Sequence, residues 1–372
     1  MKRLETFWQR VTDGMEISQL WKQFQADARS SYRLYSREVD TTQEPGTKRT
    51  HHFFDVAKQF FWAIVEKLTP ARRVLLLIAL VLLFTNIDWV WSSGNGRTDA
   101  VWFGGAFWAG LLLLALLVLE VADRVVMKRD LQIAKEIQAW LLPANPPQVP
   151  GLEIAFATRP ANTVAGDYYD VFSRQGESGA DSTFLIAVAD VAGKSVPAAM
   201  LMATFQASLK TLARTPGSLA DLVGRMNSYA CSNSQNGRRF TTTFLAEYDP
   251  GSRRLMYVNA GHNPPMLRRS SGAIERLEAG GMPVGILEGA PYEAGAVTLE
   301  SGDWLVIFTD GVTEAENKFA QEYGEARLMA VVNALAAVGP PVMLNAIMHD
   351  LDRFVGEAPQ HDDVTLLLVK AV

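Results

Sequence analysis

Three features that often reveal a protein's class are scarce or absent in this sequence: cysteine, an excess of charge of one sign, and glycine-rich nucleotide motifs. Only one of the 372 residues is a cysteine, Cys231, so no internal disulfide can form and a disulfide-stapled secreted scaffold is excluded. The 35 basic and 40 acidic residues give a net charge of −5, which offers no basic excess for a nucleic-acid partner. Neither GxGxxG nor GxxxxGK[ST] occurs, which disfavours a kinase or a nucleotidase.

Charge is also sparse and unevenly distributed. Charged residues make up 20% of the chain, and the mean hydropathy is +0.04. Residues 1–121 hold 14 basic and 12 acidic side chains, whereas residues 122–372 hold 21 and 28. The chain is long enough for about two structural units, and we expect an apolar N-terminal part followed by an acidic soluble part.

Two long apolar runs lie between residues 70 and 121. Residues 101–119 contain no charge, and residues 74–91 contain only Asn86 and Asp88 as polar interruptions near their end. Each run approaches the roughly 20 residues that cross a bilayer as a helix. Arginines and a lysine flank the outer ends, while the short link carries only Arg97. The pattern predicts a segment 71–121 with two transmembrane helices, 74–91 and 101–121, in the cell (inner) membrane, with both termini cytoplasmic. A buried hairpin would need a very large soluble core.

The segments on either side of these runs have helical periodicity. Residues 1–70 contain apolar side chains near helical spacing, which predicts a helical cytoplasmic region whose apolar face can pack internally, lie on the membrane or form a homodimer. Residues 122–148 show apolar residues at intervals of three or four up to Pro143. We interpret them as a linker helix that packs on the following domain or relays a signal to it.

Residues 149–372 alternate between strand and helix signals in blocks. Apolar strand runs are expected over 184–189, 244–248, 255–258, 304–308 and 364–369, and helices over 197–212, 219–229, 326–337 and 342–354. The turn 249–252 joins two of the strands as a hairpin, and Ser218 with Asp221 predicts a helix cap. Because strands and helices do not alternate strictly, an α+β fold with a largely antiparallel sheet is favoured.

Aspartates stand at the ends of several of these strands. Asp190 and Asp310 close strand runs, Asp362 and Asp363 precede one, and Asp167 lies in the segment AGDYYD. Strand ends that point the same way gather such carboxylates, which repel one another unless protons or a divalent cation neutralise them. Oxygen-rich clusters of this kind favour Mg²⁺ or Mn²⁺. Each motif alone is also compatible with an ordinary turn.

Taken in order, the motifs are more specific: GDxxD, DVAGKSVP, FTTTF, AGHNPP, FTDGVTE and QHDDVT. With this set, residues from about 131 to 372 resemble the SpoIIE-like branch of the metal-dependent protein phosphatases (PPM), relatives of protein phosphatase 2C. The resemblance implies a sandwich of two antiparallel β-sheets flanked by helices in a domain 149–372. It also implies two divalent metal ions, Mn²⁺ or Mg²⁺, and hydrolysis of phosphoserine or phosphothreonine on a protein.

The resemblance also implies roles for individual residues. Asp190 is expected to bridge both metals, Asp310 to bind one of them, and Asp167 to orient water. The remaining candidates are the Val191 carbonyl and Asp362 as metal ligands, with Asp363 as the alternative to Asp362, and Arg159 or Lys194 as phosphate-binding residues. Ala192 stands where the wider superfamily has a histidine proposed as general acid. His262 is interpreted as a structural turn residue rather than an acid.

Two hypotheses about function follow. The first is a membrane-anchored phosphatase acting on a phosphorylated regulatory protein, of which a STAS-domain anti-anti-sigma factor is the class that the resemblance implies. The second is a catalytically silent module that binds a partner and transmits a membrane state. A binding surface needs no cluster of carboxylates, so their presence favours the enzyme.

Overall fold

The computed structural model describes residues 62, 65, 68–85, 88–91, 101–175, 182–233 and 239–372. The chain divides into two compact units, residues 1–125 and 126–372, with the boundary inside one long helix. Each unit is described by itself. The helices expected before residue 62 lie outside the described residues.

The first unit contains two helices and a short pair of strands. Helix α4 spans Pro70–Thr85 and helix α5 spans Gly105–Leu141, while strands β1 (Asp88–Trp91) and β2 (Val101–Gly104) pair antiparallel between them. Arg72 at the start of α4 forms ion pairs with Glu120 (3.4 Å) and Asp123 (2.7 Å) of α5. These contacts join the first turn of α4 to α5 within this unit.

The two expected transmembrane spans are only partly matched. Among the described residues, α5 is the one helix that is long and apolar enough to cross a membrane, and 17% of its most apolar stretch is buried. Helix α4 has 16 residues, which is short for a span. The prediction of a helix over 74–91 is wrong at the C-terminal end of that range, because residues 88–91 form β1. Tryptophan and valine, which make up most of β1, favour extended backbone. Likewise, the second run begins as β2 rather than as helix.

The second unit is built on two β-sheets. The first has the order β10-β7-β6-β5-β4, with β11 also paired to β7, and the second has the order β3-β13-β12-β8-β9. All pairings are antiparallel except the one between β10 and β7. The strands of the first sheet are β4 (Tyr168–Gln175), β5 (Ser182–Val191), β6 (Thr241–Asp249), β7 (Arg254–Ala260), β10 (Gly280–Gly281) and β11 (Gly295–Thr298). Those of the second are β3 (Leu152–Arg159), β8 (Met266–Arg268), β9 (Ile274–Arg276), β12 (Trp304–Phe308) and β13 (Val364–Ala371).

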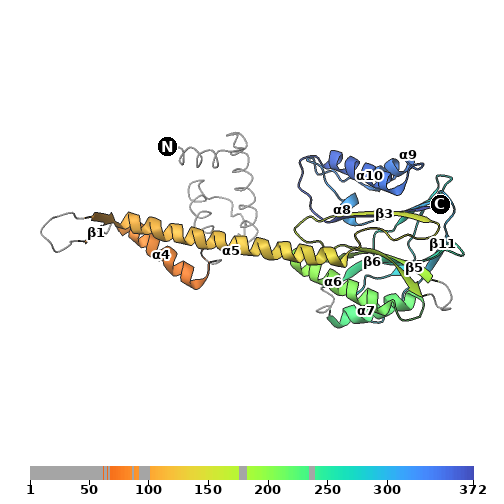
Figure 1. Cartoon of the computed structure of the whole chain (residues 1–372), viewed down its shortest axis with the longest axis horizontal. Coiled ribbons are helices and arrows are strands. Elements are labelled where there is room, and N and C mark those ends of the chain that lie inside the picture. Colours follow the sequence, from red (N-terminus) through yellow and green to blue (C-terminus); the bar gives the residue numbers. More distant parts are fainter. Residues whose placement is uncertain are drawn as a thin grey trace, which may run out of the picture. The chain divides into compact units, whose positions relative to one another are not determined.

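Helices cover the outer face of each sheet (Figure 1). Helices α6 (Ser195–Leu212) and α7 (Leu219–Asn233) pack on the sheet that contains β5, and α9 (Glu325–Ala334) and α10 (Pro340–Val355) pack on the sheet that contains β13. A central cluster of buried side chains fills the space between the sheets. The α+β fold with largely antiparallel sheets, and the helix-flanked sandwich of two sheets that the resemblance implies, are therefore confirmed.

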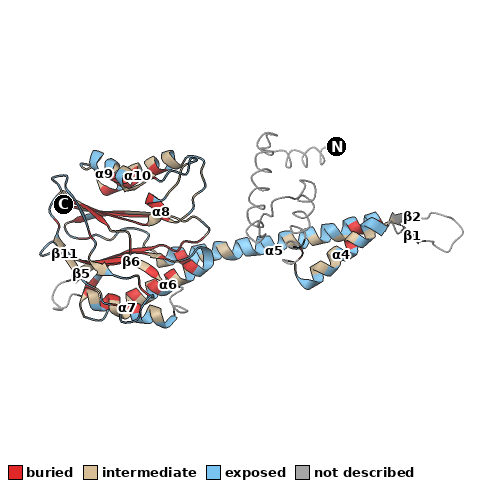
Figure 2. Ribbon diagram, turned by 180° about the vertical axis from the view of Figure 1, so that it is seen from behind, coloured by how far each residue is buried: buried red, intermediate tan, exposed pale blue. Residues whose placement is uncertain are grey.

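Local sequence signals account for most of these elements. Each strand and helix expected in residues 149–372 is present, with ends that differ by a few residues. The Ser218 hydroxyl accepts a hydrogen bond from the Asp221 backbone N–H (3.1 Å), which confirms the helix cap. Apolar side chains placed at strand or helix periods become buried on both sides of each sheet (Figure 2).

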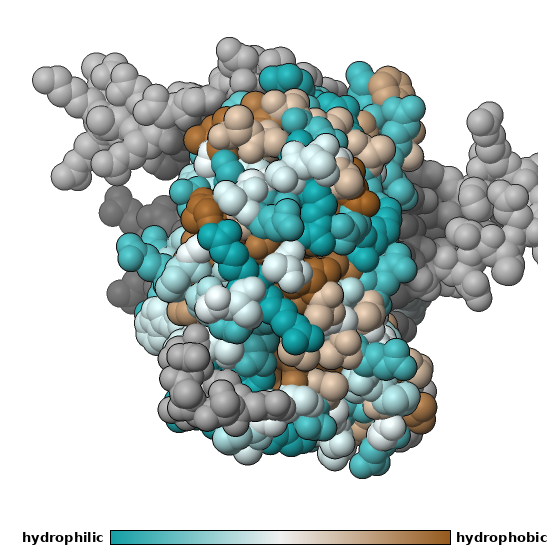
Figure 3. Space-filling view, turned by 90° about the vertical axis from the view of Figure 1, so that its right-hand side faces the viewer, coloured by the Kyte–Doolittle hydropathy of each residue, from teal (hydrophilic) through white to brown (hydrophobic). Residues whose placement is uncertain are grey.

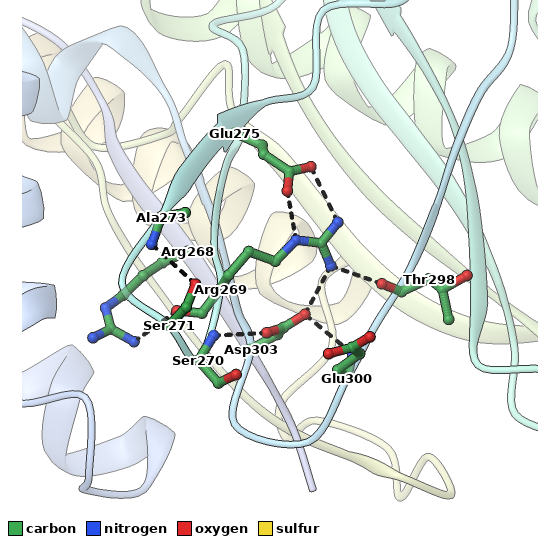
Figure 4. Close-up of polar contacts among 9 residues, drawn as sticks. All are labelled: Arg268, Arg269, Ser270, Ser271, Ala273, Glu275, Thr298, Glu300 and Asp303. Atoms are coloured by element: carbon green, nitrogen blue, oxygen red, sulfur yellow. Dashed lines mark hydrogen bonds and ion pairs between the residues drawn. The ribbon is translucent and has the colours of Figure 1, made fainter.

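A polar cluster fastens the β8–β9 hairpin to the loop before β12 (Figure 4). The Arg269 guanidinium donates to Asp303 (2.8 Å) and to both carboxylate oxygens of Glu275 (2.6 and 3.1 Å). Asp303 is 1% exposed and also accepts the Ser270 backbone N–H. Because Asp303 precedes β12 and Asp310 follows it, this cluster lies at the opposite strand end from the aspartates considered below, and we assign it a structural role.

The surface of the second unit is mixed in polarity on the face shown in Figure 3, where hydrophilic residues surround small hydrophobic groups. This is the usual composition of a water-exposed protein surface. By contrast, many apolar side chains of α4 and α5 are exposed, among them Phe84, Leu114 and Leu117.

Candidate active site

Adjacent strand ends bring the predicted aspartates into electrostatic contact. Asp190 is the second-to-last residue of β5, and the pKa of its carboxyl is raised to about 7, first by burial and then by the charges of Asp310 and Asp362. Because Asp190 belongs to one sheet and Asp310 and Asp362 to the other, this influence requires the two sheets to meet at the carboxylates.

Asp310 begins a single helical turn, α8 (Asp310–Thr313), directly after β12. Burial raises the pKa of its carboxyl, and the charge of Asp362 raises it further. The next residue is glycine for a steric reason: a Cβ on Gly311 would lie 2.1 Å from the Asp363 carbonyl oxygen. The Asp-Gly pair therefore lets α8 pack directly on the backbone that carries Asp362.

Asp167 is almost completely buried, with 2% of its surface exposed. The hydroxyl of Thr309 donates a hydrogen bond to its Oδ2 (2.9 Å). Burial, followed by the charge of Asp190, raises the pKa of the Asp167 carboxyl well above its ordinary value. Asp167 therefore lies beside Asp190, at the junction of β4 with the end of β12.

The backbone just before Asp167 is held from two directions. The Asp363 carboxylate accepts hydrogen bonds from the backbone N–H groups of Ala161 (2.7 Å) and Gly166 (2.6 Å). The buried amide of Gln138, near the end of α5, donates to the Ala165 carbonyl (2.7 Å) and accepts from the Ala165 N–H (2.9 Å). Residues 161–166, which we call the Asp167 loop, are thus fixed at three positions by side chains from distant parts of the chain.

These contacts separate the two neighbouring aspartates that the sequence left as alternatives. Both carboxylate oxygens of Asp363 are occupied by backbone donors of the Asp167 loop. Asp362 instead lines a cavity of about 350 Å³, together with Gly311 and Lys194. Asp362 is therefore the better candidate for a metal ligand, and Asp363 the better candidate for a structural role.

The donor chemistry of this site fits a divalent cation. The carboxylates are hard oxygen donors that raise each other's pKa values, and a divalent ion would relieve that repulsion. In the part of the chain that the structure describes, no three Asp, Glu, His or Cys side chains are arranged closely enough to hold a metal ion. Asp362 is paired with Lys194, so metal binding requires carboxylates such as Asp362 to rotate toward the others.

The two predicted phosphate-binding residues line the same cavity. Lys194 donates to the His361 carbonyl (2.7 Å) and forms an ion pair with Asp362 (2.8 Å). Arg159 pairs with Asp352 of α10, and its Nε is buried without a hydrogen-bond partner among the described residues. Lys194 is thus adjacent to the carboxylates, whereas the Arg159 head group is engaged by α10.

Sequence reasoning missed the residues that support the aspartates. Thr309, Thr242 and Gln138 each contact a predicted site residue or the backbone next to one. The first two lie inside motifs already noted, FTDG and FTTTF, but nothing in Gln138 itself distinguishes it from the exposed polar residues of the same helix.

Residues 180–372 match the family model described as Stage II sporulation protein E (SpoIIE). The chain is 28% identical over 308 residues to Protein IcfG of Synechocystis, covering 75% of this chain and 47% of IcfG. It is 30% identical over 247 residues to phosphoserine phosphatase RsbU of Bacillus subtilis, covering 66% of this chain and 70% of RsbU. This chain therefore spans about half the length of IcfG.

Among solved structures, the SiaA-PP2C domain of Pseudomonas aeruginosa superposes with a TM-score of 0.57 at 22% identity. The match covers 68% of this chain and 99% of that domain. At this identity the similarity establishes the fold, which is that of a PP2C-type domain.

Proposed function

The chain belongs to the SpoIIE family, and on that premise we propose that it is a metal-dependent phosphatase of phosphoserine or phosphothreonine on a regulatory protein. The observation that carries the proposal is that Asp190, Asp310 and Asp362 lie near enough, at the ends of strands from both sheets, for burial and mutual repulsion to raise the pKa values of Asp190 and Asp310. A binding module has no need for such an unfavourable cluster. The relative RsbU is named a phosphoserine phosphatase.

Two divalent ions, Mn²⁺ or Mg²⁺, would be held by Asp190, Asp310, Asp362 and the carbonyl of Val191. When bound, such ions lower the pKa of a coordinated water and neutralise phosphoryl charge. In this proposal Asp167, whose Oδ2 accepts a hydrogen bond from the Thr309 hydroxyl, would orient a water molecule near Asp190. Lys194 supplies a positive charge at the rim of the cavity, where a phosphoryl group would approach. Ala192 offers no proton, so the leaving oxygen takes its proton from another group or from water.

The substrate proposed here is a phosphorylated STAS-domain anti-anti-sigma factor. The family resemblance noted from the sequence motifs implies this substrate class, and the relatives RsbU and RsbP of Bacillus subtilis are each named a phosphoserine phosphatase. We further propose that α5 anchors the chain in a membrane, because its apolar side chains are exposed and basic residues follow its apolar run. Those basic residues favour a cytoplasmic position for the phosphatase domain.

The test compares carboxylate variants with a matched control. We expect Asp190→Asn and Asp310→Asn to abolish Mn²⁺-dependent phosphate release from a phosphoserine peptide, because each removes a charge that the metals require. Asp130→Asn, a substitution at an exposed position of α5, should leave the rate unchanged. Substantial residual activity in the two site variants would contradict the metal assignment, and an inactive wild-type chain that still binds a phosphoprotein would support the silent module instead.

A further inference from the structure

A buried histidine outside the aspartate cluster is linked to Asp190 by a side-chain contact. We propose that His262 is a positioning residue that, through Thr242, holds the Asp190 end of β5 and so sets the affinity of the site for a divalent cation. The proposal rests on the proposed function, and it adds a residue to which the family resemblance gives no role in the reaction.

The pairing of β5 with β6 brings Thr242 next to Asp190. Thr242 on β6 is the cross-strand partner of Asp190 on β5, so their side chains lie on the same face of the sheet. The Thr242 hydroxyl donates to the Asp190 carbonyl oxygen (3.4 Å), and it lies 3.2 Å from Nδ1 of His262. A hydroxyl has one proton, so if Thr242 donates to Asp190, Nδ1 of His262 must carry a proton and donate to Thr242.

The 3.2 Å contact is at the long end of the hydrogen-bond range, and the 3.4 Å contact is longer than a usual O–H···O bond. Such contacts contribute little energy individually, and their effect is to restrict where the backbone of Asp190 can lie. A metal site tolerates little displacement of its ligands, and residues that orient those ligands commonly change metal affinity by about 10- to 100-fold when mutated.

His262 is itself held firmly. Its backbone N–H donates to the Asn259 side chain (2.7 Å), and the Asn259 amide donates to the Leu277 carbonyl (3.3 Å). The preceding Gly261 has φ +71°, and a Cβ there would lie 2.4 Å from Pro283, so only glycine fits this turn. The backbone that carries the imidazole is therefore held in one position.

The ring also reaches toward the second sheet. The backbone of Phe308, the last residue of β12 and two residues before Asp310, is near enough to raise the pKa of the ring. Its Nε2 has no hydrogen-bond partner within bonding distance among the described residues. His262 thus contacts Thr242 beside Asp190 and has the end of β12 nearby.

A catalytic role in proton transfer fits this geometry poorly. His262 is 5% exposed and is not among the residues that line the cavity beside Asp362. A group that donates a proton to the leaving oxygen must come within hydrogen-bond reach of it, and this ring is buried behind Thr242. The contacts favour positioning.

The experiment uses two pairs of variants of the full chain and measures Mn²⁺ binding by calorimetry. His262→Asn keeps an amide donor near the Nδ1 position, whereas His262→Gln places its amide near the Nε2 position. Thr242→Ser keeps the hydroxyl and Thr242→Val removes it. We expect His262→Gln and Thr242→Val to weaken Mn²⁺ binding by about tenfold or more, and His262→Asn and Thr242→Ser to stay within about threefold of wild type.

Controls separate this proposal from a loss of folding and from the proposed function. Exposed His349→Asn should bind Mn²⁺ as wild type does, and circular dichroism should show that every variant is folded. The proposal is overturned if a folded His262→Gln or Thr242→Val variant keeps wild-type affinity, if both members of a pair weaken binding equally, or if wild type binds no Mn²⁺. If the expected affinity pattern appears but no phosphate is released, the proposed function fails while the positioning role stands.

Discussion

Replacing Gln138 by leucine should uncouple α5 from the Asp167 loop. Gln138 is 7% exposed, and its side-chain amide makes both of its hydrogen bonds to the backbone of Ala165. Leucine has a similar size and no polar atoms, so the substitution removes both bonds and leaves the Ala165 N–H and C=O unpaired. Ala165 is 1% exposed, which keeps water from replacing the lost partners while the loop stays in place.

The size of the effect follows from these two groups. A buried backbone donor or acceptor without a partner costs about 1–3 kcal/mol, so a loop that stays in place, with two such groups, should lower the free energy of unfolding by about 2–6 kcal/mol. If the loop instead moves to reach water, that cost falls, but Asp167 is displaced from Thr309 and Asp190. Stability and turnover should therefore not both remain at wild-type levels.

The assay combines urea denaturation with kcat for a phosphoserine peptide at saturating Mn²⁺. Gln132→Leu is the matched control, because Gln132 lies on the same helix at an exposed position. Gln138→Glu provides a second comparison, since it keeps the acceptor for the Ala165 N–H and replaces the donor to the Ala165 carbonyl. If Gln138→Leu matches Gln132→Leu in both unfolding free energy and kcat, the reasoning about the Asp167 loop is refuted.

Three further predictions concern the same domain. Asp363→Ala should lower the unfolding free energy by about 2–4 kcal/mol, because two backbone N–H groups lose their acceptor. The folded variant should still bind Mn²⁺ when binding is measured by calorimetry. Loss of Mn²⁺ binding with unchanged stability would make Asp363 a metal ligand instead. Lys194→Met should raise KM for a phosphopeptide several-fold with kcat nearly unchanged, whereas an unchanged KM would remove Lys194 from phosphate binding. Burial lowers the pKa of His262 to about 4, while the unfolded side chain titrates near its ordinary value of 6.5; the unfolded state therefore binds a proton that the native state excludes, and the contribution of His262 to stability should fall by about 2 kcal/mol from pH 7 to pH 5. The raised pKa of Asp190 acts in the opposite direction in wild type and variant alike, so urea denaturation in EDTA should show the fall as a difference between wild type and His262→Asn, and equal slopes would contradict the buried neutral ring.

Much of the fold was predictable because its determinants are local. The strand over 304–308 is a run of five apolar residues, all of them buried in the structure, and the cap at Ser218 is set by residues three positions apart. The failure came where local signals competed: residues 74–91 are apolar enough for a transmembrane helix, yet the helix ends at Thr85 and strand β1 follows. Hydropathy measures apolarity over a window and does not register where backbone pairing becomes favourable.

The candidate site was predictable in type but not in detail. Asp190 and Asp310 were identifiable from sequence because each follows or ends an apolar strand run. The ends of neighbouring strands lie together at one end of a sheet. The choice between Asp362 and Asp363 needed the structure, since the two residues are adjacent and chemically identical. Only the direction of each side chain shows that Asp363 caps the Asp167 loop while Asp362 lines the cavity.

By itself, then, the sequence determined five strands and four helices of the C-terminal domain, the identity of its carboxylates and the family to which the motifs belong, but not strands β3, β4 and β8 to β11. The features that it determined depend on side-chain type and on spacing along the chain. Tertiary structure alone decided that Gln138 holds the backbone before Asp167 and that His262 reaches Asp190 through Thr242. Gln138 and Ala165 are 27 positions apart, and His262 and Thr242 are 20 positions apart. Their contacts therefore form only when tertiary packing brings these segments together.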